Sequence, residues 1–183
     1  MYLSKNKNFL VIERFDKDKG FEEVLSLLKK TKIFKYQGSY EQVAKVVYSF
    51  VNDVKDLEKL FKMIILNFLL KNGDAHLKNF GLLYEDDFSN ITLSPAYDVV
   101  TTTVYLPKDK PALSIDGRKI WHKRKTLINY GVKYCLLSEK KANEYFDECV
   151  ECVKRGIEYI KDYANKNPAF EKIGTKMITI WQG

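Results

Sequence analysis

The sequence predicts a helix-rich α+β domain with a small β element at its centre. Two short apolar runs, at residues 80–84 and 91–93, flank a polar turn and indicate a β-hairpin. The 183 residues contain no internal repeat or low-complexity linker, and this length suits one domain. Around the hairpin, apolar residues recur at the spacing of amphipathic helices. These helical segments are residues 21–31, 40–50, 57–71, 142–160 and 170–181.

The first half of the chain is predicted to lead into a buried helix. Residues 8–13 read as a short buried strand. Ser39 is placed to cap the helix over residues 40–50. The helix over residues 57–71 is strongly apolar. We expect Gly73 to help end it, because glycine is the usual residue just past a helix end.

The second half returns to helices after a further short strand at residues 112–115. Helical spacing resumes from Lys123, and Ser138 is expected to cap a long helix. Cys149 and Cys152 fall on the apolar face of that helix, so we expect both to be core cysteines and not metal ligands. Three cysteines cannot all pair within one chain, and the first residues are too polar for a signal peptide. We therefore expect a reduced, cytoplasmic setting.

The charge balance favours anionic partners. Lysine and arginine together number 31, against 24 aspartate and glutamate residues, which gives a net charge of +7. Such a surplus suits ATP, RNA or DNA as a partner, and it also aids solubility. An apolar content of 45% argues against disorder. The longest apolar run, residues 63–70, is far shorter than a membrane span, so we expect no membrane contact.

One short region carries the residues that chemistry would need. Residues 72–79 read Asn-Gly-Asp-Ala-His-Leu-Lys-Asn, and a second aspartate, Asp98, follows the predicted hairpin. An Asp-x-x-x-x-Asn loop followed by a metal-binding Asp is what phosphoryl transfer from ATP requires. Asp74 would orient and deprotonate the attacking hydroxyl. The amide oxygen of Asn79 and the carboxylate of Asp98 are hard oxygen ligands suited to Mg²⁺. The pattern therefore indicates the large lobe of a kinase.

Of three neighbouring residues, two have two interpretations each and the third has one. His76 stands where a kinase has a cation at the γ-phosphate, so it either contacts the nucleotide or ties the loop to backbone carbonyls. Lys78 either neutralises phosphate charge on the nucleotide or is a solvated lysine. Tyr97 is expected to pack beside Asp98 and aim it, which is a structural role.

A basic cluster offers another class of function. Arginine and lysine residues at 118–125 flank Trp121, and they are either a contact for nucleic acid backbone or a solvated basic face. A metal-dependent nuclease using Asp74, His76 and Asp98 is a further hypothesis. Such enzymes bring more carboxylates, and the acidic residues 85–87 read as a solvated turn.

Several segments resemble the HipA family of serine/threonine kinases, the toxins of bacterial toxin–antitoxin pairs. Residues 72–80 are similar to the catalytic loop of that family, and residues 93–100 are similar to its metal-binding segment. The Glu-Arg-Phe-Asp of residues 13–16 resembles its hinge between lobes. Residues 35–40 and 112–117 also resemble family segments.

The resemblance implies a protein-kinase-like, HipA-type large lobe with Mg²⁺ and ATP as cofactors. It implies that Asp74 is the catalytic base and that Asn79 and Asp98 hold Mg²⁺. Glu13 and Phe15 would lie at the hinge, where main-chain atoms meet adenine.

The same resemblance divides the single domain of residues 1–183 into four parts. Residues 1–16 form the hinge-like strand and residues 17–71 form helices. Residues 72–117 form the catalytic loop and hairpin region, and residues 118–183 form the C-terminal helices. The implied partners are a protein substrate, such as an aminoacyl-tRNA synthetase, and a small helix-turn-helix antitoxin. Because that antitoxin binds operator DNA, contact with DNA would be indirect.

The sequence departs from this pattern at its start. Only about eight residues precede the hinge-like strand, and the nine glycines include no Gly-x-Gly pair. No lysine stands in a Val-Ala-Ile-Lys setting. We therefore expect the small lobe to be largely absent, as in a split enzyme with a separate small-lobe polypeptide, a shortened form or a remnant. The first hypothesis is a kinase large lobe that becomes active with a small lobe in trans. The alternative is a catalytically incomplete module that binds an antitoxin, a translation factor or DNA.

Overall fold

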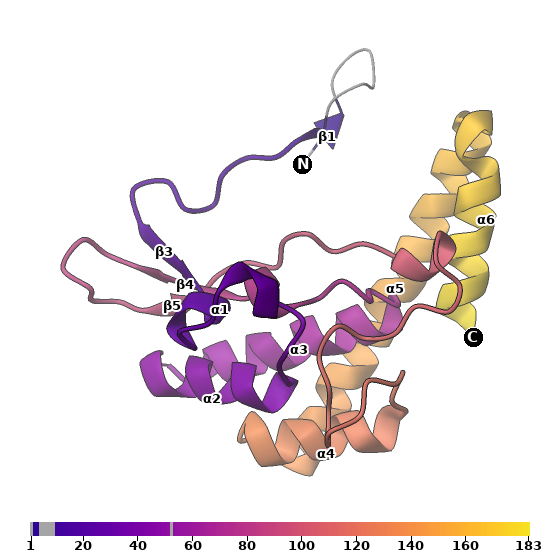
Figure 1. The fold of residues 1–183 in the computed structure, drawn as a ribbon. Coiled ribbons are helices and arrows are strands. Elements are labelled where there is room, and N and C mark those ends of the chain that lie inside the picture. The colour runs from indigo at the N-terminus through magenta and orange to yellow at the C-terminus, as the bar shows by residue number, and fades with distance from the viewer. Residues whose placement is uncertain (1, 4–9, 52) are drawn as a thin grey trace.

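The computed structural model describes residues 2–3, 10–51 and 53–183, and it confirms the helix-rich α+β architecture (Figure 1). The helices are α1 (Val24–Leu27), α2 (Tyr40–Phe50), α3 (Lys55–Leu69), α4 (Arg124–Tyr134), α5 (Glu139–Lys166) and α6 (Pro168–Gln182). The strands are β1 (Tyr2–Leu3), β2 (Leu10–Val11), β3 (Gly20–Glu23), β4 (Gly81–Tyr84) and β5 (Thr92–Leu93). Single 3-10 turns occur at η1 (Lys32–Phe34), η2 (Leu77–Asn79) and η3 (Thr102–Val104).

The predicted hairpin is present as β4 and β5, but it belongs to a three-stranded antiparallel sheet in the order β3-β4-β5. The prediction of one helix over residues 21–31, within a helical segment 17–71, was wrong at its start. Gly20–Glu23 pairs with β4, with Gly20 opposite Tyr84, and only one helical turn follows. The spacing of apolar residues did not distinguish a helix from a short strand followed by one helical turn, because both bury the same apolar residues.

The core is built around α3, which lies beneath the sheet (Figure 1). Leu60, Phe61 and Ile64 of this helix are fully buried. The neighbouring helix α2 begins as predicted at Ser39. The Ser39 hydroxyl accepts a hydrogen bond from the Gln42 amide, and the Gln42 side chain accepts one from the Ser39 amide. This capping box satisfies two amides that a helix start leaves unpaired.

The end of α3 differs from the prediction in one respect. Lys71, and not Gly73, adopts the left-handed conformation, with φ 53°. A larger residue at position 73 would meet two neighbouring side chains, which would have to move. A Cβ there would lie 2.1 Å from Oδ2 of Asp109 and 2.8 Å from Oγ1 of Thr102. The loop that follows α3 is therefore pressed against the segment after β5.

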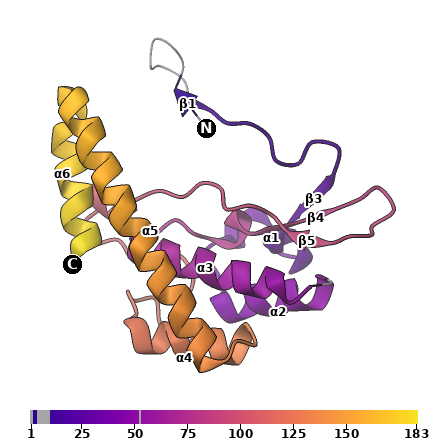
Figure 2. The same ribbon diagram turned by 180° about the vertical axis from the view of Figure 1, so that it is seen from behind.

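The C-terminal helices confirm the predicted order. Ser138 caps α5 by accepting a hydrogen bond from the amide of Lys141. Pro168 opens α6, which runs back along the end of α5, as both views show (Figures 1 and 2). Proline is favoured at the first helical position because its fixed φ suits the helix. Cys149 is buried as expected, but Cys152 is exposed, so the expectation that both are core residues was half wrong.

Two predicted strands are shorter than expected. Of residues 8–13, Leu10–Val11 form a strand that pairs with Tyr2–Leu3, while residues 8 and 9 lie outside the described part. Residues 112–115 form isolated bridges, Ser39 to Ser114 and Ile115 to Arg118, and not a strand. Within the described ranges, the helices are all too short or too polar to traverse a lipid bilayer.

Candidate active site

The loop after α3 is held in place by Asn72, whose side chain is almost fully buried. Its Nδ2 donates to Oδ1 of Asn67 at 2.8 Å and to the backbone oxygen of Asp98 at 3.4 Å. Its Oδ1 accepts from the amide of Asp74 at 3.1 Å. Asn72 therefore joins the end of α3 to both aspartates that the sequence singled out. No role was assigned to Asn72 from the sequence, where it read only as part of a turn.

Asn79 and Asp98 lie in direct contact. Nδ2 of Asn79 donates to Oδ2 of Asp98 at 3.1 Å, and Oδ1 of Asn79 accepts from the amide of His76 at 3.0 Å. Asp98 has φ 54°, a left-handed conformation that non-glycine residues adopt infrequently. The two residues predicted to share a metal ion are thus side by side.

Tyr97 has packing contacts, as expected, and that it aims Asp98 stays a prediction. Its hydroxyl donates to the backbone oxygen of Lys78, which ties the Asp98 segment to the loop. Its ring packs against Phe15 at 5.4 Å and Phe21 at 6.0 Å between ring centroids. Burial, with the nearby charges of Glu23 and Asp98, raises the pKa of Tyr97 far above its ordinary value, so the phenol stays neutral and donates.

Asp74 is bound by a residue to which the sequence assigned no role. The hydroxyl of Tyr36 donates to Oδ1 of Asp74 at 2.6 Å, and its ring meets the imidazole of His76 edge-on at 5.2 Å. Nζ of Lys119 donates to the backbone oxygen of Tyr36 at 2.7 Å. The hydrogen bond to Asp74, followed by burial, raises the pKa of Tyr36. The only sequence signal was that residues 35–40 resemble a family segment.

His76 is buried beneath this contact, with 6% of its surface exposed. Its Nδ1 has no hydrogen-bond partner among the residues that the structure describes. Burial first, and the charge of Lys35 second, lower the pKa of His76, so the imidazole is neutral at pH 7. The charges of Asp74 and Asp98 both act in the opposite direction on this pKa. Both carboxylates therefore lie near the same imidazole.

The other three predicted site residues differ in whether they contact the catalytic loop or its neighbours. Phe15 lies beside Tyr97 and thus borders the site. Lys78 forms an ion pair with Glu23 of β3 at 3.4 Å. Glu13 is exposed, and its carboxylate pairs with a nearby lysine at 3.2 Å and not with the catalytic loop. The structure thus brings Asp74, His76, Asn79 and Asp98 together, and it leaves Glu13 apart.

The donor set fits a hard divalent cation. Among the described residues, His, Cys, Asp and Glu side chains form no group of three or more that would enclose a metal ion. Mg²⁺ does not require such a cage, because it is usually held by one or two carboxylates together with water and substrate phosphates. Asp98 supplies one carboxylate, and Oδ1 of the adjacent Asn79 supplies an amide oxygen. These two side chains are the ones that would hold Mg²⁺.

The basic cluster has structural partners. The Trp121 ring packs against Phe68 at 5.8 Å, and its indole nitrogen donates to the backbone oxygen of Asp109 at 3.1 Å. Lys119 is engaged with Tyr36, as described above. Among the acidic turn residues, Glu85 pairs with Lys19 at 3.2 Å. Because Trp121 is engaged in packing, these contacts do not favour a platform on which bases stack. Because Glu85 pairs with Lys19, they do not favour a role for it as an additional nuclease carboxylate.

Comparison with known proteins points to one family. The HipA-like C-terminal domain model matches residues 1–157. The protein named "Putative kinase Y4dM" of Sinorhizobium fredii is 30% identical over 118 residues, which are 60% of this chain and 28% of that protein. A "Putative kinase" of Haemophilus influenzae is 38% identical over 68 residues, which are 37% of this chain and 20% of that protein.

A solved structure shares the fold. It is the Shewanella oneidensis MR-1 toxin–antitoxin system complex of HipA, HipB and operator DNA, with a TM-score of 0.73 and 15% identity. The match covers 93% of this chain and 47% of that chain, so our chain spans about half of the solved protein. The match to each of the two curated relatives covers less than a third of that relative's length. Because the family model covers most of the sequence, the chain belongs to the family of HipA-like C-terminal domains.

Proposed function

We propose that this chain is the large lobe of a serine/threonine protein kinase, which transfers the γ-phosphoryl group of Mg-ATP to a protein hydroxyl. One observation carries the proposal. Asn79 is hydrogen-bonded both to the carboxylate of Asp98 and to the amide of His76, two residues after Asp74. A base and two oxygen ligands for Mg²⁺ are thereby linked, as phosphoryl transfer requires. The names of the relatives support the kinase class.

Each side chain has a defined task in this proposal. Asp74 accepts the proton of the attacking serine or threonine hydroxyl, for which it needs a free carboxylate oxygen within hydrogen-bond reach. Tyr36 occupies only Oδ1 of that carboxylate. Asn79 and Asp98 would hold Mg²⁺, which when bound neutralises charge that develops on the phosphates. His76 is neutral and buried, and it supports the catalytic loop from inside the protein. Phe15 would border the part of the site that binds adenine.

The transfer would also need a small lobe. In kinases the phosphate-covering loop and the ATP-binding lysine precede the hinge, and positioning by these groups supplies much of the rate. We therefore expect the chain to bind Mg-ATP weakly by itself and to transfer phosphate when a small lobe is present, for example as a separate polypeptide.

The partners follow from the same proposal. The solved relative was determined with HipB and operator DNA. We infer that this chain also meets a small helix-turn-helix antitoxin, so that contact with DNA is indirect. The protein substrate would be a cytoplasmic protein such as an aminoacyl-tRNA synthetase.

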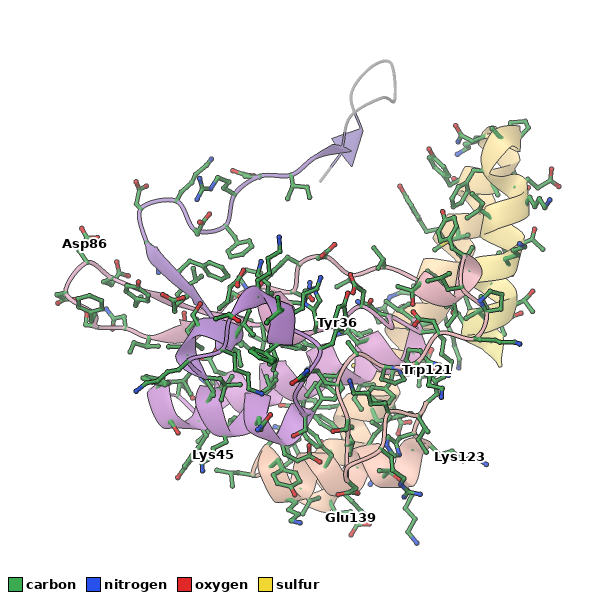
Figure 3. All side chains as sticks on the ribbon, in the orientation of Figure 1. Tyr36, Lys45, Asp86, Trp121, Lys123 and Glu139 are labelled. Atoms are coloured by element: carbon green, nitrogen blue, oxygen red, sulfur yellow. The ribbon has the colours of Figure 1, made fainter. Side chains whose placement is uncertain are left out.

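Phosphoryl transfer in the presence of a small lobe tests the proposal. The full chain would be mixed with the N-terminal part of a HipA-like relative, Mg²⁺ and labelled ATP, and the label on protein measured. Asp74→Asn should lower the transfer rate by roughly 10²–10⁴-fold, which is the usual contribution of a general base. Asp86→Asn is the matched control, because Asp86 lies at the exposed tip of the hairpin, far from Tyr36 (Figure 3). Equal activity of Asp74→Asn and the parent would refute the proposal.

A further inference from the structure

The catalytic loop itself offers no free cation for the phosphoryl group. Charge that spreads over the oxygens of a transferred phosphoryl group is stabilised by metal ions and by cationic side chains. His76, two residues after Asp74, is buried, and burial followed by the charge of Lys35 lowers its pKa, so its imidazole is neutral. Lys78 is paired with Glu23 at 3.4 Å. A cationic side chain for this task therefore has to come from another segment of the chain.

Lys35 is held beside the catalytic loop by its backbone. Its carbonyl oxygen accepts a hydrogen bond from the amide of Leu77 at 3.1 Å. Leu77 is fully buried and begins the turn η2, which ends at Asn79. The backbone of Lys35 is therefore fixed to the same turn that carries one of the two proposed metal ligands.

The side chain of Lys35 lies close to the proposed base. Its Nζ is over the Tyr36 ring, 4.7 Å from the ring centroid, and the hydroxyl of that ring donates to Oδ1 of Asp74 at 2.6 Å. The same ring meets the imidazole of His76 edge-on at 5.2 Å. In agreement with these distances, the hydrogen bond to Asp74 and burial raise the pKa of Tyr36, and Lys35 opposes that rise. Tyr36 therefore contacts the ammonium group, the imidazole and the carboxylate.

The ammonium group of Lys35 has no partner of opposite charge. Among the described residues, no carboxylate forms an ion pair with it. Lys35 is half-buried, and its Nζ remains open to solvent. Two neighbouring lysines are engaged with backbone oxygens, Lys119 with that of Tyr36 at 2.7 Å and Lys30 with that of Gln37. Lys35 therefore presents an uncompensated positive charge that an anion can reach.

We propose that Lys35 is a further catalytic residue, whose ammonium group binds the γ-phosphoryl group of ATP during transfer; this inference rests on the proposed function. In the transfer, the acceptor oxygen forms a bond to the γ-phosphorus and the hydroxyl proton goes to Asp74. The bond from that phosphorus to the bridging oxygen breaks, and its electron pair leaves with ADP. Lys35 keeps its protons throughout and offsets the negative charge on the oxygens of the transferred group. Because ADP lacks this group, the contact distinguishes the two nucleotides.

Nucleotide binding tests this contact without turnover. The full chain would be titrated with Mg-ATP and, separately, with Mg-ADP, and the two dissociation constants measured from NMR shifts of backbone amides. Lys35→Gln should bind Mg-ADP as the parent does, and its preference for Mg-ATP over Mg-ADP should be reduced by roughly two- to fivefold, the usual contribution of a solvent-accessible charge pair. Lys35→Arg should keep the preference, because a guanidinium group also binds phosphate. Lys32→Gln removes an exposed lysine from the turn η1 and should behave as the parent.

Phosphoryl transfer with the small lobe present is the second measurement. Lys35→Gln should lower the turnover number by roughly 10²–10³-fold, the usual effect of removing one group that stabilises charge in the transition state, and Lys35→Arg should restore most of it. An unchanged preference for Mg-ATP in Lys35→Gln, or a turnover number equal to that of the parent, would overturn this inference and leave the proposed function intact. If Lys35→Gln loses the preference but the parent transfers no phosphate, the proposed function fails and the γ-phosphate contact stands.

Discussion

The hydroxyl of Tyr36 donates a hydrogen bond to Oδ1 of Asp74 across 2.6 Å, although the two residues are 38 positions apart. The tyrosine is fixed independently of this bond. The amide of Leu77 donates to the backbone oxygen of Lys35 at 3.1 Å, and Lys119 holds the backbone oxygen of Tyr36. Because its backbone is anchored on both sides, Tyr36 is suited to position the carboxylate, and it leaves Oδ2 for the attacking hydroxyl that we propose.

Tyr36→Phe should lower the turnover number for phosphoryl transfer by roughly 10–100-fold with little change in the KM for ATP. The reason is that a loosely held base reduces the fraction of productive geometries, and small misplacements cost about this much. Steady-state kinetics with the small lobe present would measure it. Tyr48→Phe, at an exposed position of α2, is the control. A faster Tyr36→Phe enzyme would show that the hydroxyl blocks the acceptor position and does not support the base.

The neutral state of His76 predicts how stability depends on pH. Its pKa is lowered from an ordinary value of 6.5, mainly by burial, so the unfolded chain takes up the proton more readily than the folded one. The stabilising contribution is therefore complete above pH 6.5 and is lost as the pH falls from there toward the folded-state pKa.

Urea unfolding between about pH 7.5 and pH 5.5 would measure this loss. The free energy of unfolding of His76→Gln should fall less over this interval than that of the parent. His122→Gln removes the other histidine and is the control for loss of an imidazole as such. If His76→Gln retains the parental slope, the imidazole of His76 is not responsible for the pH dependence.

The capping box of α2 predicts a stability change unrelated to the site. Ser39→Ala should lower the free energy of unfolding by about 0.5–2 kcal/mol, because it leaves the Gln42 amide without its side-chain acceptor. Ser49→Ala, near the end of the same helix, removes only an exposed hydroxyl that donates to the Lys45 carbonyl. It should change stability by less than about 0.5 kcal/mol. Equal effects of the two substitutions, measured by urea unfolding, would argue against the cap.

The helices were predictable because their signals are local. Ser39 and Ser138 mark the starts of α2 and α5, and the apolar spacing within α3 matches its buried face. The strand β3 was missed because four residues are too few for the spacing to separate strand from helix. Its position depends on pairing with β4, which lies far along the chain and leaves no local signal.

The sequence indicated which residues form the candidate site, but it did not indicate the contacts between them. Asp74, Asn79 and Asp98 were identified by residue type and order. The left-handed conformation of Asp98 and its contact with Asn79 result from how β4 and β5 return the chain to the loop. Tyr36 comes from a segment before α2, so its contact with Asp74 is visible only in the folded chain.

In the proposed enzyme, Asp74, Asn79 and Asp98 surround one metal-bound nucleotide. The most direct measurement is paramagnetic broadening of backbone amide signals on addition of Mn²⁺ and ATP, since it detects weak binding and does not require turnover. We predict that the amides of Asp74, Asn79 and Asp98 broaden first, that Asp98→Asn suppresses the effect, and that Asp86 at the hairpin tip is unaffected. Broadening centred elsewhere in the molecule, or unchanged in Asp98→Asn, would show that these three residues do not form the nucleotide site.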